Sequence, residues 1–374
     1  MKIKNIKEFL QKKIKSDVGF LYVLSGVVFL IALGLLVWFV GNYVYNYYYE
    51  DSDISSPSDI VKKEKNEDCE FPRFLDGVCV ADAQEQNPQL IAVMIENHTE
   101  ARPQSGLVDA NVVYEAPVEA NYSRFLAIYP VDTEVEKAGP VRSARPYYLD
   151  WVSEYGDPIY MHVGGSPEAL RLIRQYDFFD INEMTKGWYF WRSTDRYAPH
   201  NTFTSSKLWG DAWDKLGSDD KNKKTESEIA WWNFLTSAEY LDMQNLDETA
   251  SSTFVDEIKV SFLSPVYEAI WQFNTSTGKY DRFQMEGAHR DLDGRKIKAD
   301  TVVVQHVRSK VLDSIGRIAI DTIGEGEVEV YYDGMVFTGT WKKPDRTTRT
   351  RFFDESGKEI KLKPGKIWIE VINR

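Results

Sequence analysis

The sequence predicts an α+β fold preceded by one transmembrane helix, and three observations lead to this class. Residues 18–41 form an uninterrupted apolar run. Between Ile91 and Leu216 the apolar segments alternate between strand and helix patterns, and after Asp256 they follow a strand pattern with turn signals between them. Hydrophobic residues make up 43% of the chain and charged residues 28%, which excludes wholesale disorder. We therefore expect a folded ectodomain whose C-terminal half is β-rich.

The apolar run is typical of a membrane-spanning signal anchor. Residues 18–41 lack charged side chains and would give about 36 Å of helix, enough for a hydrocarbon core of roughly 30 Å. Six lysines precede the run, whereas Glu50, Asp51 and Asp53 follow a tyrosine-rich stretch. The positive-inside rule then predicts a cytoplasmic tail over 1–17 and an extracytoplasmic chain after the helix, in a single-pass protein of the cell membrane. A buried core helix and a cleaved signal peptide are the alternatives, and the length of the run disfavours the peptide.

The extracytoplasmic part divides by composition into four segments. Residues 42–66, rich in Ser, Asp, Lys and Glu beyond the tyrosines, are expected to form a flexible tether. An N-terminal domain over 67–232, a linker or inserted segment over 233–254, and a C-terminal domain over 255–374 are expected to follow. Cys69 and Cys79 flank an Asp-Gly turn, which favours a hairpin disulfide in an oxidising compartment, with two free thiols as the alternative.

Individual elements follow from local patterns. Strands are predicted in both halves, and helices are predicted only in the first half. The predicted strands are 91–95, 112–115, 124–129, 159–163, 258–263, 267–273, 301–307, 317–321, 328–332 and 367–371, and the predicted helices are 145–155, 167–176 and 205–216. Ser166, Pro167 and Glu168 form a good helix start, with the serine as N-cap. Gly324-Glu-Gly-Glu327 lacks the context of a phosphate loop and is expected to form a turn.

Charge limits the classes of partner. The net charge of −13 and the pI of about 5.0 exclude the whole chain as a nucleic-acid binder. An acidic domain binds an anionic polymer only through a local basic site. Arg142 and Arg145 precede a predicted helix and Arg102 lies in another polar loop, so these arginines could form an anion site. The alternative is that they form ion pairs with Glu96, Glu115 or Glu119 inside the fold.

A second group of polar residues could line the same pocket: His98, His162, His200 and Asn201. Glu96 and His98 are two residues apart and could act as acid–base groups. The histidines are scattered without local ligand spacing, so neither a metal site nor a cofactor is predicted. Ser166 is expected to cap a helix, because no nucleophile elbow surrounds it. The aromatic run 187–191 could stack sugar rings or could fill the core.

Several phrases of the sequence resemble a known bacterial family. They are Ile-Glu-Asn-His (95–98), Ala-Arg-Pro-Gln-Ser-Gly-Leu (101–107), Gly-Pro-Val-Arg-Ser-Ala-Arg-Pro-Tyr (139–147), His-Val-Gly-Gly-Ser-Pro (162–167), Ala-Pro-His-Asn (198–201), Gly-Glu-Gly-Glu (324–327), Gly-Thr-Trp (339–341) and Pro-Gly-Lys-Ile-Trp-Ile-Glu (364–370). In this order they resemble the YerB-like family, catalogued as two linked domains of unknown function. The resemblance covers residue 68 to the C-terminus and implies an envelope-facing protein with a layered sandwich of the β-β-α type. The family's better-known members are lipoproteins, whereas this chain lacks a lipobox cysteine.

The sequence thus favours a membrane-anchored extracytoplasmic protein that binds an anionic or glycan ligand of the cell envelope, or a protein partner. The alternative is a hydrolase or lyase that acts on a cell-wall polymer, with Glu96 and His98 as acid–base groups. A third interpretation is an assembly protein that docks another membrane protein through an aromatic face.

Overall fold

The structure is a computed structural model that describes residues 29–41, 69–217, 231–240, 254–262, 264–285 and 287–374. The chain divides into two units, Met1–Lys63 and Glu64–Arg374. In the first unit, residues 29–41 form a helix whose large apolar side chains are exposed. Among the described residues no helix has both the length and the apolar character needed to cross a membrane. The rest of the predicted span, residues 18–28, and the tether predicted over 42–66 lie outside the described residues.

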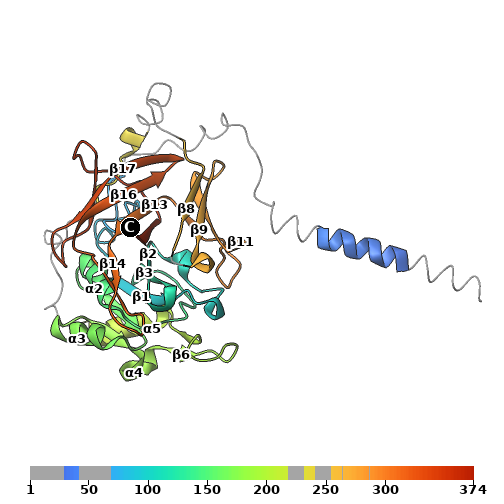
Figure 1. Ribbon diagram of the computed structural model, residues 1–374, viewed down its shortest axis with the longest axis horizontal. Coiled ribbons are helices and arrows are strands. Elements are labelled where there is room, and N and C mark those ends of the chain that lie inside the picture. The colour runs from blue at the N-terminus through green and yellow to red at the C-terminus, as the bar shows by residue number, and fades with distance from the viewer. Residues whose placement is uncertain (1–28, 42–68, 218–230, 241–253, 263, 286) are drawn as a thin grey trace, which may run out of the picture. The chain divides into compact units, whose positions relative to one another are not determined.

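A ten-stranded mixed sheet forms the centre of the second unit (Figure 1). Its strands come from both halves of the sequence. In spatial order they are β18 (Arg351–Asp354), β17 (Met335–Lys343), β16 (Gly324–Tyr332), β13 (Thr301–Val307), β19 (Ile367–Asn373), β2 (Val112–Pro117), β3 (Ser123–Pro130), β1 (Leu90–Glu96), β4 (Ile159–His162) and β5 (Asp180–Asn182). The two halves meet where β19 pairs parallel with β2, with Ile367 opposite Val112.

The large sheet is parallel in two places. Strands β1, β4 and β5 are parallel to one another, and so are β13, β19 and β2. Strand β3 is antiparallel to both β1 and β2, so β1 and β2 also run in the same direction. The carboxyl ends of β1, β2, β4 and β5 therefore lie at one edge of the sheet. This is the edge where ligands bind in open sheets that contain parallel strands.

Smaller sheets and short helices complete the unit. The further strands are β8 (Glu257–Val260), β9 (Ala269–Asn274), β10 (Lys279–Gln284), β11 (Gly287–Ala288) and β12 (Lys298–Ala299) in a second sheet, β6 (Trp191–Arg192) paired with β7 (Thr202–Phe203), and β14 (Ser309–Val311) paired with β15 (Ile318–Ile320). The helices are α2 (Pro146–Val152), α3 (Pro167–Gln175), α4 (Glu183–Lys186) and α5 (Ser206–Leu216), with 3-10 turns at 99–101, 107–109, 119–121, 153–155, 187–189 and 265–267.

The two faces of the large sheet are covered by different elements. Strand β1 has every residue buried, and its alternate side chains belong to two separate apolar clusters. Ala92 and Met94 contribute to the cluster that includes Trp151 of α2 and Ile173 of α3. Ile91 and Val93 contribute to the cluster that includes the second sheet and α5. Figure 1 shows α2 and α3 on one side of the large sheet and the second sheet on the other.

Most local predictions agree with this fold. The C-terminal half is β-rich, Cys69 and Cys79 form the predicted disulfide, and Ser166 caps α3 by accepting a hydrogen bond from the amide of Ala169. The predicted helix over 145–155 ends earlier, because α2 gives way to a 3-10 turn at Ser153. The predicted domain boundaries stay predictions, and residues 241–253 of the expected linker lie outside the described part.

The turn predicted at Gly324-Glu-Gly-Glu327 is wrong, because these residues begin strand β16. They pair in register with β17, with Gly326 opposite Trp341. A Cβ atom at position 326 would lie 2.6 Å from Trp341 Nε1 and 2.7 Å from the carbonyl oxygen of His306. The Trp341 indole donates a hydrogen bond to that carbonyl. Gly326 is therefore explained by the close approach of this hydrogen bond to the strand, and not by a turn.

Candidate functional site

A cluster of charged side chains lies at the carboxyl ends of β1 and β4. The segment Val141–Ala144 lies between these two strand ends: the amide of Arg142 donates to the Met94 carbonyl, and the Arg142 carbonyl accepts from Val163. Glu96 is the last residue of β1 and is 4% exposed. Its two carboxylate oxygens contact different partners, Arg142 Nε at 2.8 Å and His200 Nδ1 at 2.8 Å. Glu96 is thus enclosed by an arginine and a histidine.

His98 lies beside this pair. Its ring stacks on the ring of His200, with centroids 4.7 Å apart, and meets the edge of Tyr122 at 5.0 Å. His98 Nδ1 accepts the amide hydrogen of Glu100 at 3.2 Å, as the N-cap of the turn at 99–101. Glu100 in turn places Oε2 3.2 Å from His200 Nε2. The histidine that contacts Glu96 is therefore His200, whereas the acid–base alternative named His98 beside Glu96.

Arg102 lies next to the cluster but is held by other groups. It donates from Nε to Asn97 Oδ1 at 3.0 Å and from Nη2 to the Val266 carbonyl at 3.2 Å. Its guanidinium lies over the ring of Tyr267, 5.1 Å from the centroid. Burial lowers the pKa of Arg102 from its ordinary value. These contacts tie the loop after β1 to the C-terminal half of the chain.

The remaining predicted residues lie in separate contacts. Arg145 forms an ion pair with Glu119 through two nitrogens. His162 is fully buried, with Nδ1 2.7 Å from the Gly164 carbonyl and Nε2 3.3 Å from Asp180. Asn201 follows His200 and donates to the Ser193 carbonyl at 3.0 Å. The structure thus brings Glu96, His98, Arg142 and His200 together, with Arg102 linked to them through Asn97.

These contacts bear on the choice between an anion site and structural ion pairs. The strongest partners of Arg142 and Arg145 are Glu96 and Glu119, two of the acids named by the structural alternative. An arginine that already holds a carboxylate in this way must give up that partner before it can bind an external anion. The predicted arginine site therefore has little free positive charge to offer.

The aromatic run 187–191 divides between core and surface. Tyr189 and Phe190 are buried, whereas Trp188 is 66% exposed. Trp191 stacks on Phe203 of the neighbouring strand β7. Tyr189 and Phe190 therefore belong to the core, whereas Trp188 lies on the surface.

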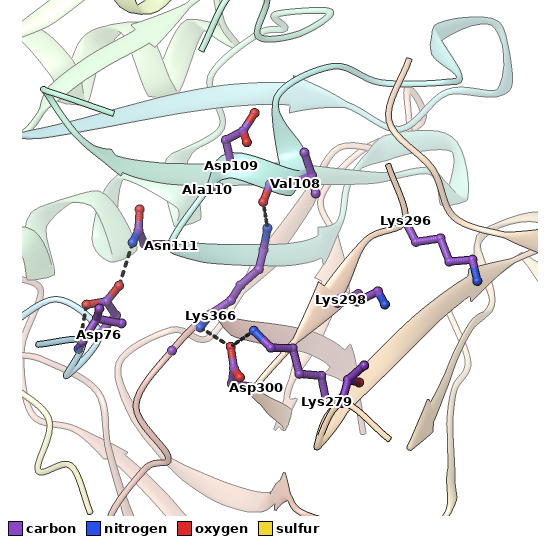
Figure 2. A pocket seen from close by; sticks show the side chains of 13 residues that line it. Asp76, Val108, Asp109, Ala110, Asn111, Lys279, Lys296, Lys298, Asp300 and Lys366 are labelled. Atoms are coloured by element: carbon purple, nitrogen blue, oxygen red, sulfur yellow. Dashed lines mark hydrogen bonds and ion pairs between the residues drawn. The ribbon is translucent and has the colours of Figure 1, made fainter. Parts of the chain in front are cut away.

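A lysine-lined pocket of about 510 Å³ lies elsewhere in the same unit (Figure 2). It is formed by the Val108–Asn111 segment and Asp76 from the N-terminal half and by strands and loops of the C-terminal half. Four lysines line it, Lys279, Lys296, Lys298 and Lys366, together with three aspartates, Asp76, Asp109 and Asp300. In Figure 2 Lys366 reaches the backbone at Val108, and Lys279 points toward Asp300.

Two of the three acids of this pocket are paired with groups outside its lining. Asp76 forms an ion pair with Arg73 at 2.7 Å, and Asp109 forms one with Arg295 at 2.6 Å. Neither arginine lines the pocket. Asp300 accepts from Lys279 at 3.1 Å and from the backbone amide of Lys366 at 2.9 Å. Lys298 in turn lies 3.5 Å from Asp281, so Lys279 and Lys298 are paired with acids and the positive charge of the four lysines is partly offset, in a protein whose net charge is −13.

Lys366 is the most constrained of these lysines. Its Nζ donates to the carbonyls of Leu107 and Val108, at 2.5 and 2.9 Å. Burial lowers the pKa of Lys366 to about 8, although three nearby aspartates, Asp291, Asp109 and Asp300, favour its charged form. This pocket could not be predicted from the sequence, because its lysines are spread over 88 positions and no local motif joins them. The weak signal was Lys296-Ile-Lys298, in which an extended segment places two lysines on one face.

Comparisons with known proteins agree with the resemblance seen in the sequence. Residues 75–219 match the family described as "Protein of unknown function (DUF3048) N-terminal domain", and residues 258–369 match its C-terminal domain. The chain is 28% identical over 293 residues to "Putative lipoprotein YerB" of Bacillus subtilis (strain 168), covering 75% of this chain and 80% of that protein. The crystal structure of YerB from Bacillus subtilis superposes with a TM-score of 0.66 at 25% identity, over 80% of this chain and 95% of that one. The chain therefore belongs to the DUF3048 family, and YerB of Bacillus subtilis is a distant homologue of it.

Proposed function

We propose that this protein is a membrane-anchored, extracytoplasmic protein of the cell envelope that binds an anionic envelope ligand in the lysine-lined pocket. The observation that carries the proposal is the pocket itself, which four lysines line and where two of the three acids are held by arginines outside the lining. Phosphate and carboxylate groups are the chemistry that such a pocket recognises, because lysine ammonium groups bind them as point charges.

The envelope location has four supports. The uncharged run 18–41 follows six lysines, a pattern typical of a single-pass anchor with its N-terminus in the cytoplasm. The described part of this run, 29–41, is helical and exposes its apolar side chains. The disulfide between Cys69 and Cys79 suits an oxidising compartment, and the Bacillus relative is named a lipoprotein. In this chain a transmembrane helix would anchor the protein in the bilayer, as a covalent lipid does in a lipoprotein.

Removal of two pocket lysines should weaken anion binding. We expect Lys279→Gln/Lys298→Gln to bind pyrophosphate at least tenfold more weakly than the unchanged protein, because two of the four ammonium groups are lost. The measurement is isothermal titration calorimetry on the full chain in mild detergent. Lys310→Gln is the matched control, since Lys310 is an exposed lysine of β14 outside the pocket. Equal affinity in the double variant and the unchanged protein, or equal losses in the double variant and the control, would refute the proposed site.

Anion binding should also depend on pH. Since the pKa of Lys366 lies at about 8 in the folded protein, this lysine loses its positive charge as the pH rises through that value. We expect the affinity for sulfate, whose own charge does not change in this range, to fall several-fold between pH 7 and pH 9. Asp291, Asp109, Asp300 and Lys279 are the charged groups that face Lys366. A sulfate affinity that stays constant from pH 7 to pH 9 would exclude Lys366 from the binding site.

A further inference from the structure

We propose that His98, Glu100 and His200 form a binding site for a divalent transition metal of the zinc class. Each of the three side chains offers one ligand atom, and these atoms all lie within 4.8 Å of one another. Two imidazoles and one carboxylate are a ligand set that suits zinc and its neighbours in the transition series, whereas magnesium and calcium prefer oxygen alone. This site is separate from the lysine-lined pocket, with which it shares no residue.

The position of His200 is the strongest argument. Its Nδ1 lies 2.8 Å from a carboxylate oxygen of Glu96, which can only accept a hydrogen bond, so Nδ1 carries the proton. In the neutral imidazole Nε2 then has a lone pair, and this lone pair faces Oε2 of Glu100 at 3.2 Å. Two lone pairs at this distance repel each other unless a cation lies between or beside them. A metal ion placed beside these two atoms would bind both lone pairs.

Glu96 has the role of a supporting carboxylate in this arrangement. Histidines that bind metals usually donate their other ring N–H to a carboxylate or carbonyl, which fixes the tautomer and the orientation of the ring. Glu96 accepts the Nδ1 proton of His200 while Arg142 holds its other oxygen at 2.8 Å. Both carboxylate oxygens of Glu96 thus have a partner. The other ring nitrogen of His200, Nε2, faces Glu100.

His98 and Glu100 complete the ligand set from the turn that follows β1. The His98 ring stacks on His200 and its Nδ1 accepts the amide hydrogen of Glu100 at 3.2 Å. Since a ring nitrogen binds a metal in the plane of its ring, the His98 ring would tilt out of this stack when the ion binds. Glu100 is an exposed residue, so its carboxylate can adjust to an ion that enters from solvent. Three protein ligands with an open side are typical of zinc sites that keep a position for water or substrate.

The test is a metal titration of the full chain after treatment with a chelator. We expect one equivalent of Zn²⁺ to bind, and one equivalent of Co²⁺ to give visible absorption from nitrogen and oxygen ligands. His98→Ala and His200→Ala should each lower the Zn²⁺ affinity at least tenfold and abolish the Co²⁺ absorption. Glu100→Gln, a change at an exposed side chain, should weaken binding without an effect on the thermal unfolding of the metal-free protein.

His306→Ala is the matched control, because His306 also lies beside a carboxylate, Glu329 at 3.5 Å, but outside the cluster. It should bind Zn²⁺ as the unchanged protein does. The proposal is overturned if the chain binds no stoichiometric metal. It is equally overturned if the three variants of the cluster bind Zn²⁺ as tightly as the control. Each variant is also titrated with pyrophosphate, so that a failure of the metal site is distinguished from a failure of the proposed anion site.

Discussion

Replacement of Arg282 by methionine is expected to lower the free energy of unfolding by about 3 to 5 kcal/mol, because it leaves a buried charge without its partner. Arg282 lies on β10 and is completely buried. It donates to Glu115 of β2 and to His289 Nδ1, and its Nε lies 3.5 Å from Glu370 of β19. The guanidinium also lies 5.0 Å from the ring centroid of Trp368. Methionine would keep much of the volume but none of the charge.

Chemical denaturation at neutral pH, followed by tryptophan fluorescence, measures this change. Arg317→Met is the control: Arg317 forms an exposed ion pair with Asp313, and such pairs contribute little to stability. The double variant Arg282→Met/Glu115→Gln removes the stranded charge and should recover part of the loss. A loss below about 1 kcal/mol in the single variant would show that Glu115 does not depend on Arg282.

The same network reaches the residues of the candidate metal site. Asn97 follows Glu96 and donates to Glu115 and to Ser123. Gln104 donates to the carbonyl of Glu96 and to Asn97, while its oxygen lies 3.0 Å from His289 Nε2. The loop that carries His98 and Glu100 is therefore bound at both ends to a buried network that includes residues of the C-terminal half. This connection explains how a loop can hold two ligand groups in a defined place.

Local structure could be predicted from the sequence because its causes are local. Ser166, Pro167 and Glu168 mark the start of α3, and the Asp-Gly turn between Cys69 and Cys79 brings the sulfurs together. The strands of the C-terminal half follow from alternating patterns between turn residues. Each of these signals lies within about ten residues of the feature it predicts.

The partners of charged residues could not be predicted in the same way. Glu96 and His200 are 104 positions apart, and Arg282 and Glu115 are 167 positions apart, so only the folded sheet brings them together. The sequence did indicate that Arg142 could pair with Glu96, and it placed His98 and His200 in one pocket. It could not choose His200 over His98 as the partner of Glu96, because that choice depends on where the loop before β7 crosses the end of β1.

Glu370 provides the largest expected pH effect in the protein. Burial, and then the nearby charge of Glu115, raise the pKa of Glu370 to about 8, while Arg282 acts in the opposite direction. In the unfolded chain the pKa of this residue is near 4.5. Between these two values the folded state binds more protons than the unfolded state, so its stability decreases as the pH rises. Each pH unit in this interval corresponds to about 1.4 kcal/mol.

The unchanged protein should therefore lose about 2 kcal/mol of unfolding free energy between pH 6.5 and pH 8. We expect this loss to be absent in Glu370→Gln. Glutamine keeps an oxygen for the Trp271 indole, which donates to Glu370 Oε1 at 2.9 Å, and it does not titrate. The interval avoids His289, whose pKa burial and Arg282 hold well below 6.5. Glu325→Gln, at an exposed position on β16, should leave the pH dependence unchanged. If the unfolding free energies of Glu370→Gln and the unchanged protein depend on pH in the same way, Glu370 is already ionised at pH 6.5. Arg282 would then neutralise two buried carboxylates instead of one.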